Sequence, residues 1–338
     1  MSKRCRRRFL HAARTHFDRM IAQMAQSLRG KLTEVSAEAH RELSQQLTAS
    51  LVDGKTVLFE DAGALGDYTL KRLRPRCRAL LEVLLAEDSV LVLESILKRF
   101  ELAEREKREL RVVSLGGGPG FDAVALLAAM ESFREAQLQE RTHTVADLRP
   151  NTMDPLDGPR PLRCHVLDLA PAWAPALVAL RSAATEIWPI CAEDFLQLMA
   201  PIDLRECDNS QVIEEISTAD LVIASYVLHE NEAALLKDGL LAGAIPDVFR
   251  SVPLGVPLIF LDATHRLWPA LVHTAELQGH FSVTIPEGMT SHIHAVVFIR
   301  EEGVEQRKPD EIYVPCFETF SAHQKANQAR LQRLNTKF

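Results

Sequence analysis

The sequence predicts an α/β fold built around a mostly parallel sheet, with an additional helical region before it. At 111–122 a short apolar strand runs into a glycine-rich turn that opens a helix. Apolar strands then alternate with helical segments, which is typical of parallel sheets whose strands are joined by helices. Two closely spaced strands at 281–285 and 294–299 predict an antiparallel pair that closes the sheet. The expected strands number seven.

The glycine-rich turn is the stretch around which the other elements are arranged. Gly116, Gly118 and Gly120 follow a G-x-G-x-G spacing. Glycine is needed where the backbone adopts a positive φ or where a ligand approaches the main chain closely. The dinucleotide fingerprint requires its third glycine one residue later, where Phe121 stands, and no Lys-Ser or Lys-Thr follows as in a phosphate-binding loop. The turn therefore predicts a cofactor pocket of another kind, or an ordinary tight turn.

A second stretch, ADLVIASYVLHE at 219–230, reads as a fourth strand and its exit loop. Together with the glycine turn it resembles the class I S-adenosylmethionine-dependent methyltransferases, over roughly residues 105–300. The resemblance implies a seven-stranded Rossmann-like sheet, S-adenosyl-L-methionine as cofactor and methyl transfer as activity. It also implies cofactor contacts by these residues of the turn: Ser114, Gly116, Gly117, Gly118 and Gly120. Many members carry an acid where this chain has Ser114.

Two more strand exits carry expected cofactor contacts. Asp168 ends an expected strand at 163–168, where the resemblance implies that a carboxylate accepts the ribose hydroxyls. Alternatively, Asp168 caps the segment that follows. The third strand is expected at 187–191, with Asp194 and Phe195 at its exit, where the resemblance implies contacts to the adenine. Asp194 could equally be a helix N-cap.

The exit of the fourth strand carries the expected catalytic groups. The resemblance implies that Ser225 contacts the cofactor and that Tyr226, His229 and Glu230 face the acceptor. His229 is the leading candidate for a general base, because an imidazole titrates near neutral pH. Alternatively, His229 only shapes the start of the next helix, which is expected over 235–248. A fifth strand is expected at 257–261.

The chain divides by pattern into three regions. Residues 1–105 are expected to be helices that cap the sheet, and 106–305 to form the cofactor-binding domain. Residues 306–338 form a basic C-terminal tail. Within the central region, 139–161 is rich in proline and poor in apolar residues, which predicts an insertion loop.

The N-terminal region contains two apolar stripes with helical spacing, at 17–28 and 35–51. A short segment then leads through Tyr68 to a basic cluster at 71–78. Pro75 is expected to interrupt this cluster, and a leucine-rich helical region follows it.

Composition limits the other expectations. The net charge is −7 among 338 residues, but the basic residues gather near the N-terminus, at 71–78 and in the tail. These clusters could bind RNA, act as a targeting address, or simply form solvated faces. The six cysteines form no C-x-x-C pair, so neither a metal site nor a disulfide framework is expected. No membrane span is expected, and the oligomeric state stays open. The expected location is cytoplasmic or nuclear, with the Arg-rich N-terminus as an alternative organelle signal.

The first functional interpretation is therefore a methyltransferase whose acceptor is a small molecule, an RNA or a protein. The alternative is a catalytically silent methyltransferase-fold protein that serves in binding or assembly. A nicotinamide-dependent oxidoreductase is a third interpretation, which Phe121 disfavours because it stands at the third fingerprint glycine.

Overall fold

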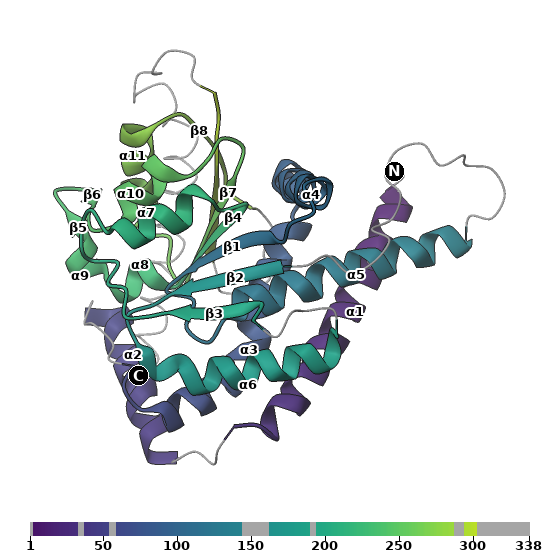
Figure 1. Ribbon diagram of the computed structural model, residues 1–338, viewed down its shortest axis with the longest axis horizontal. Coiled ribbons are helices and arrows are strands. Elements are labelled where there is room, and N and C mark those ends of the chain that lie inside the picture. Colours follow the sequence, from purple (N-terminus) through teal and green to yellow (C-terminus); the bar gives the residue numbers. More distant parts are fainter. Residues whose placement is uncertain are drawn as a thin grey trace, which may run out of the picture.

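A computed structural model of the chain describes residues 3–32, 37–53, 59–143, 162–189, 194–286 and 294–302. Its centre is a seven-stranded sheet in the order β3-β2-β1-β4-β7-β9-β8 (Figure 1). The strands are β1 Leu110–Leu115, β2 Leu162–Leu167, β3 Leu196–Met199, β4 Leu221–Ser225, β7 Pro257–Asp262, β8 Phe281–Thr284 and β9 His294–Arg300. A separate two-stranded hairpin consists of β5 Leu236–Lys237 and β6 Leu240–Leu241.

The sheet confirms the predicted fold class. β3, β2, β1, β4 and β7 pair in parallel, whereas β9 runs antiparallel to both β7 and β8. The chain passes from β1 outward to β2 and β3, and then crosses to β4 on the other side of β1. This reversal of direction opens a crevice at the carboxyl ends of β1 and β4, the usual place for a ligand in such sheets.

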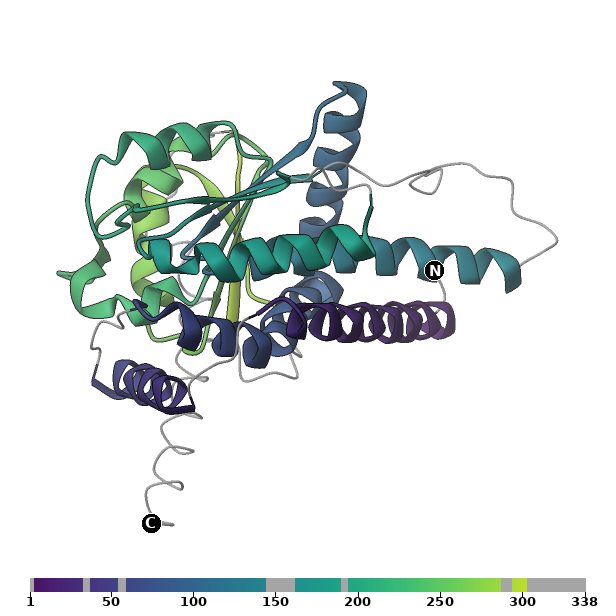
Figure 2. The ribbon, with the colours of Figure 1, turned by 60° about the horizontal axis from the view of Figure 1, so that its bottom comes forward.

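Helices cover both faces of the sheet (Figures 1 and 2). The long ones are α1 Lys3–Arg29, α2 Ala37–Asp53, α3 Ala62–Leu85, α4 Val90–Arg105, α5 Phe121–His143 and α6 Ala174–Ile187. The others are α7 Ser210–Ser217, α8 Val227–Glu230, α9 Glu232–Leu235, α10 Ile245–Ser251 and α11 Trp268–Gln278, with 3-10 turns at Glu87–Ser89 and Pro171–Trp173. One hydrophobic core joins α1, α3, α5 and α6 to one face, and a second joins α7, α10 and α11 to the other.

The N-terminal helices form a second layer over α5 and α6. The predicted stripe on α1 is buried, with Phe17, Ile21 and Leu28 fully inaccessible. Figure 2 shows α1 lying alongside α5, against which it packs. Because α5 contacts the sheet on one side and α1 and α3 on the other, its first ten residues, 121–130, are all buried and almost all apolar. This packing brings α3 to the carboxyl edge of the sheet.

α3 corrects the expectation that Pro75 interrupts the basic cluster. A single helix runs over 62–85, and its N-terminus is capped by Asp61, whose Oδ1 accepts from the backbone N–H of Ala64 at 2.7 Å. Proline removes a hydrogen bond from a helix interior. The helix continues nonetheless because Leu73 and Cys77 on either side of Pro75 are fully buried, so tertiary packing outweighs the local cost.

The expected third strand at 187–191 was wrong. Ile187 is the last residue of α6, and β3 begins only at Leu196. The apolar run that suggested a strand instead continues the buried face of α6 into Trp188, which is 7% exposed. Asp194 and Phe195 consequently lie at the amino end of β3. The cofactor contact was expected at its carboxyl end.

The helix expected over 235–248 is also broken. Between α9 and α10 the chain forms the β5–β6 hairpin, whose turn residues Asp238 and Gly239 have φ of 51° and 80°. Asp-Gly with two positive φ angles is the preferred two-residue hairpin turn. α5 extends to His143, so the first residues of the predicted loop at 139–161 are helical. The rest of that loop and the tail at 306–338 lie outside the described residues.

Candidate active site

A cavity of about 430 Å³ lies at the carboxyl ends of β1, β2 and β4. This volume falls within the range of small-molecule sites, about 300–1,000 Å³. Its walls come from the glycine turn, from the exits of β2, β3 and β4, and from residues of the N-terminal region. The cavity thus occupies the position predicted for the cofactor.

The glycine turn has the backbone that its sequence predicts. Gly116, Gly118 and Gly120 have φ of +59°, +55° and +98°, which other residues rarely adopt. Gly116, Gly117 and Gly118 line the cavity. Gly120 does not line it, and a Cβ there would lie 2.7 Å from the Leu196 side chain, so this glycine allows close packing on β3.

Beneath the turn, a buried carboxylate binds two serine hydroxyls. Ser114 Oγ donates to Asp122 Oδ2 at 2.6 Å, and Ser225 Oγ donates to Asp122 Oδ1 at 2.7 Å. Asp122 and Ser225 line the cavity, whereas Ser114 supports the turn from below. Burial raises the pKa of Asp122, and the two hydroxyls oppose that shift. The sequence analysis missed Asp122, although an acid in the first turn of the helix after a glycine turn is a usable signal.

Asp168 lies where it was predicted, directly after β2 at the cavity wall. Its Oδ2 accepts from the backbone N–H of Gly118 at 3.0 Å, and its Oδ1 accepts from that of Ala170 at 2.9 Å. Asp168 therefore both fixes the local turn and presents a carboxylate to the cavity. Burial raises its pKa to about 6, although the backbone N–H groups oppose the shift.

At the exit of β3, the cavity is lined by Ile202, Asp203 and Leu204 instead of the expected pair. Asp203 accepts two hydrogen bonds from the Arg205 guanidinium, at 2.7 and 2.6 Å. Asp194 and Phe195 are far from this position in the sheet. The Asp194 side chain is 52% exposed and pairs with Arg163 at 3.3 Å, and Phe195 is fully buried in the core.

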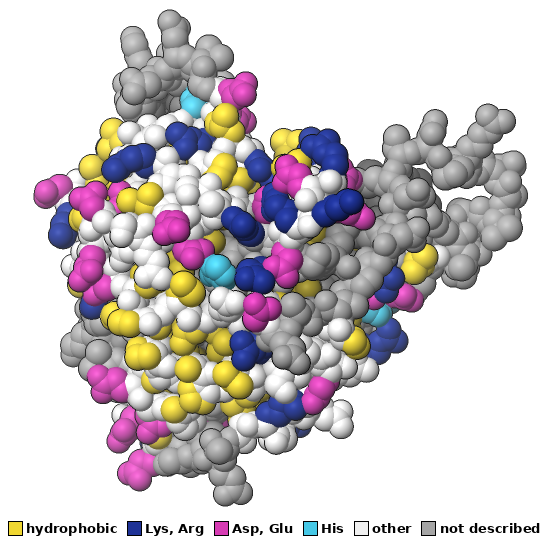
Figure 3. Space-filling view, viewed as in Figure 1, with side chains coloured by type: hydrophobic (Ala, Val, Ile, Leu, Met, Phe, Trp, Pro, Cys, Tyr) yellow, Lys and Arg dark blue, Asp and Glu magenta, His cyan; other side chains and the backbone are white. Residues whose placement is uncertain are grey.

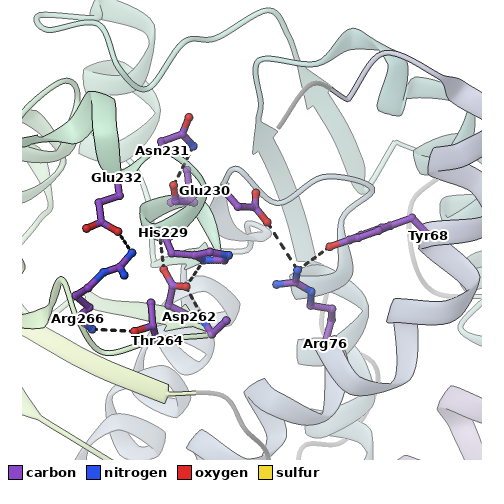
Figure 4. A network of polar contacts seen from close by, with 11 residues as sticks. Tyr68, Arg76, His229, Glu230, Asn231, Glu232, Asp262, Thr264 and Arg266 are labelled. Carbon is purple, nitrogen blue, oxygen red and sulfur yellow. Dashed lines mark hydrogen bonds and ion pairs between the residues drawn. The ribbon is translucent and has the colours of Figure 1, made fainter. Parts of the chain in front are cut away.

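The side of the cavity nearest α3 carries a charged cluster (Figure 4). Arg76 donates to the Tyr68 hydroxyl at 2.6 Å, lies over the Tyr226 ring and reaches within 4.0 Å of Glu230. All four residues line the cavity. The sequence analysis counted Arg76 with the surface basic cluster and gave Tyr68 no role. The missed signal is spacing, since Arg76 falls in the buried stripe of α3 between Leu73 and Leu80.

His229 and Glu230 are adjacent in sequence but differ in position. His229 is 3% exposed, does not line the cavity, and contacts Asp262 through its Nδ1. Its backbone N–H also donates to Asp262 Oδ2 at 3.1 Å. Burial lowers the pKa of His229, but the hydrogen bond and charge of Asp262 outweigh it, so the pKa is raised overall. Glu230 does face the cavity, and burial raises its pKa to about 7.

Aromatic rings from two parts of the chain form one wall of the cavity. Trp173, which follows β2, lies 5.7 Å from Tyr68 and 5.4 Å from Phe59 between ring centroids. Phe121 lies 6.4 Å from Tyr68. The N-terminal region therefore completes the cavity instead of merely covering the sheet.

No protein-family model and no curated protein matches the chain. Among solved structures it is similar to precorrin-6y C5,15-methyltransferase from Geobacter metallireducens, with a TM-score of 0.33 and 11% identity over 57% of this chain and 80% of that one. A 16S rRNA (adenine(1408)-N(1))-methyltransferase from Catenulisporales acidiphilia gives 0.35 and 13%, over 63% and 92%. The N-terminal domain of EvdMO1 with SAH bound gives 0.31 and 12%, over 62% and 81%.

At identities and TM-scores this low, the fold assignment rests on the strand order and the reversed β9. They define a Rossmann-like α/β fold with a seven-stranded, mostly parallel sheet. The cavity at the carboxyl edge of this sheet has more acidic than basic side chains in its lining. Five acids line it, namely Glu60, Asp122, Asp168, Asp203 and Glu230, against Arg76 and Arg205. Such a lining favours a ligand with positive charge over a polyphosphate.

The basic cluster on α3 is largely paired with acids. Lys71 lies 2.7 Å from Asp67, Arg74 lies 3.5 Å from Asp18, and Arg78 lies 3.8 Å from Glu82. On the face of the molecule that Figure 3 shows, acidic and basic side chains are interspersed. Within the described residues, no helix is long and apolar enough to cross a membrane, and no group of acids, histidines and cysteines could hold a metal.

Proposed function

We propose that this protein is an S-adenosyl-L-methionine-dependent methyltransferase acting on a small-molecule acceptor. The observation that carries the proposal is a glycine turn at the sheet's reversal point that contains no basic residue and is flanked by the carboxylates Asp122 and Asp168. A nicotinamide dinucleotide would place its pyrophosphate against these carboxylates. A sulfonium cofactor carries positive charge and no phosphate, which suits the same surface.

The residues present fit this cofactor. Gly116, Gly117 and Gly118 present main chain without side chains at the cavity wall, which permits close approach of a ligand. A Cβ at these positions would crowd Val227, Ser114 and Trp173, so the protein's own packing also requires glycine there. The Asp168 carboxylate has acceptor capacity left after its two backbone hydrogen bonds, so it would hold the ribose hydroxyls. Asp203 and Leu204 line the cavity at the exit of β3 and would make the adenine contacts that the resemblance implied for Asp194 and Phe195.

When bound, the cofactor supplies an electrophilic methyl group, so the main task of the protein is to position the acceptor in line with it. Such positioning contributes about 7–11 kcal/mol in favourable intramolecular reactions. Tyr226 and Glu230 lie at the exit of β4, and Glu230 Oε is the group in the cavity wall that takes the proton which the acceptor loses. His229 is buried against Asp262, so we assign it the positioning of α8.

The acceptor is a small molecule because of what surrounds the α3 side of the cavity. Phe59, Tyr68 and Trp173 form an aromatic wall that suits a flat, partly apolar molecule. An RNA backbone would instead require unpaired basic residues, whereas Lys71, Arg74 and Arg78 on α3 pair with acids.

Calorimetry with S-adenosylhomocysteine and with NAD tests the cofactor, and binding of NAD alone would overturn the proposal. Incubation with cofactor labelled in its methyl group and a cell extract, followed by separation into small-molecule, RNA and protein fractions, tests the acceptor. We expect label in the small-molecule fraction. Cofactor binding without any transfer would favour the silent binding protein instead.

A further inference from the structure

Asp122 is a buried carboxylate whose charge is not matched by a cation at hydrogen-bonding distance in the described structure. It is 4% exposed, lies at the second position of α5 and lines the cavity. Its side-chain hydrogen bonds come from the hydroxyls of Ser114 and Ser225, one to each oxygen. Arg76 acts on Asp122 only through its charge.

Neutral hydroxyls do not fully replace the water that a carboxylate loses on burial. A buried charge normally requires an opposite charge or several strong donors. Each carboxylate oxygen can accept about two hydrogen bonds, so each oxygen of Asp122 has acceptor capacity left beyond its serine, and the residue lines the cavity. Asp122 therefore has the features expected of a group that binds a cation from the ligand.

The surroundings hold this carboxylate in one place. Ser114 comes from β1, Ser225 from β4 and Asp122 from the start of α5, so three elements meet at its two oxygens. Ser114 Oγ lies directly beneath Gly117, where a Cβ would collide with it. The carboxylate is thus held next to Ser114, below the glycine turn.

We propose that Asp122 binds the ammonium group at the amino-acid end of the cofactor, and that it selects a cofactor with this end over the nucleoside part alone. The inference rests on the proposed function. An ammonium donates hydrogen bonds to the free sites of both oxygens, which a sulfonium cannot do. Asp168, on the exit of β2, serves the nucleoside end of the same ligand.

The test compares two probes in calorimetry on the full chain. S-adenosylhomocysteine carries the amino-acid end, whereas 5′-methylthioadenosine lacks it. We expect Asp122→Asn to weaken S-adenosylhomocysteine binding by roughly 10- to 100-fold, the range for hydrogen bonds to charged groups. Binding of methylthioadenosine should change less than about twofold, since that probe has no ammonium to lose. Asp168→Asn is the matched control, because it should weaken both probes alike.

A pair of double variants guards against loss of folding in Asp122→Asn. S114D/D122S exchanges the two side chains and keeps the combined volume, whereas S114N/D122S has nearly the same shape without the charge. We expect the first to bind S-adenosylhomocysteine at least tenfold more tightly than the second, for the same reason. Thermal unfolding checks that both are folded.

The outcomes separate this inference from the proposed function. Equal weakening of both probes by Asp122→Asn, or equal affinities of the two double variants, overturns the role of Asp122. Failure of the unsubstituted chain to bind either probe overturns the proposed function itself.

Discussion

The two ends of the cavity are built in different ways. At the glycine-turn end, backbone N–H groups and buried carboxylates follow directly from the ends of β1 and β2, as Gly118 and Asp168 do. At the α3 end, Tyr68 and Arg76 meet Glu230, more than a hundred residues further along the sequence (Figure 4). The first end is fixed by local backbone geometry, whereas the second depends on how the N-terminal helices pack. An end fixed by local backbone geometry would suit a common cofactor. An end that depends on helix packing would suit a particular acceptor.

The largest expected effect comes from disrupting the glycine-turn end. Gly118→Val places a β-branched side chain at φ +55°, 3.2 Å from Trp173 and within the cavity wall. We expect no measurable binding of S-adenosylhomocysteine in calorimetry. Gly239→Val is the matched control, since it imposes the same backbone strain at φ +80° in the distant hairpin, where no atom lies within 4 Å. Unchanged affinity in a folded Gly118→Val protein would refute the cofactor pocket.

At the α3 end, Glu230→Gln removes the proposed proton acceptor and nearly preserves shape. Turnover should fall by about 10²–10⁴-fold, the usual contribution of general-base catalysis, while cofactor affinity stays the same. In the unsubstituted protein, turnover should rise with pH through about 7, the pKa of Glu230, because the carboxylate is the active form. The Gln variant should lose that dependence.

His229→Asn supplies the contrast within the same segment. It breaks a buried pair with Asp262, which typically costs about 3–5 kcal/mol when one partner is removed. We expect a lower melting temperature with nearly normal turnover per folded molecule. If turnover instead falls as far as in Glu230→Gln, the imidazole takes part in the chemistry.

A smaller effect is expected in the pH dependence of ligand affinity at the glycine-turn end, where Asp168 lies. The pKa of Asp168 is raised from 3.8 to about 6 in the free protein. The ribose hydroxyls would donate to the ionised form, so affinity for S-adenosylhomocysteine should rise about tenfold per pH unit below 6. Asp168 alone should make the free protein less stable as pH rises from about 4 to 6, because the folded state binds more protons in that window. Asp168→Asn should abolish both trends in calorimetry and thermal unfolding.

The smallest effect is expected on the outer face of α3. Replacing Arg72, Arg74 and Arg78 by Gln leaves Arg76 and the cavity intact. Exposed ion pairs contribute about 0–1 kcal/mol each, so the melting temperature should change little. Binding of a generic single-stranded RNA should show no steep salt dependence in either protein. A steep dependence that the three substitutions remove would restore RNA as the partner.

The sequence was sufficient for those parts of the fold that local signals specify. Val112 and Val113 lead into a glycine turn, and the run ending at Asp168 is apolar and bounded by turn residues, so β1, β2 and their exits were predicted. β3 failed because a strand of four residues, Leu196–Met199, carries too little periodicity to compete with the apolar end of α6.

The site was predictable to the same extent. Gly116, Gly118 and Asp168 could be predicted because they stand directly after strands. At such positions the place in the sequence already indicates the role in the site. Arg76 did not follow, because a basic residue among basic neighbours looks like a surface group until the packing of α3 is known. Asp122 was overlooked since its role depends on Ser225, which pairing of β1 with β4 brings close.

The core shared by α1 and α5 also affects the order in which the chain can fold. During synthesis α1 is made before its partners α3, α5 and α6. Part of its apolar stripe can pack on α3 early, but the stripe is fully covered only when the chain has been made as far as Ile187, the end of α6. Contacts between such distant segments form slowly, because a long loop must close before they are made. The N-terminal helices are thus the part of the nascent chain most in need of protection from aggregation.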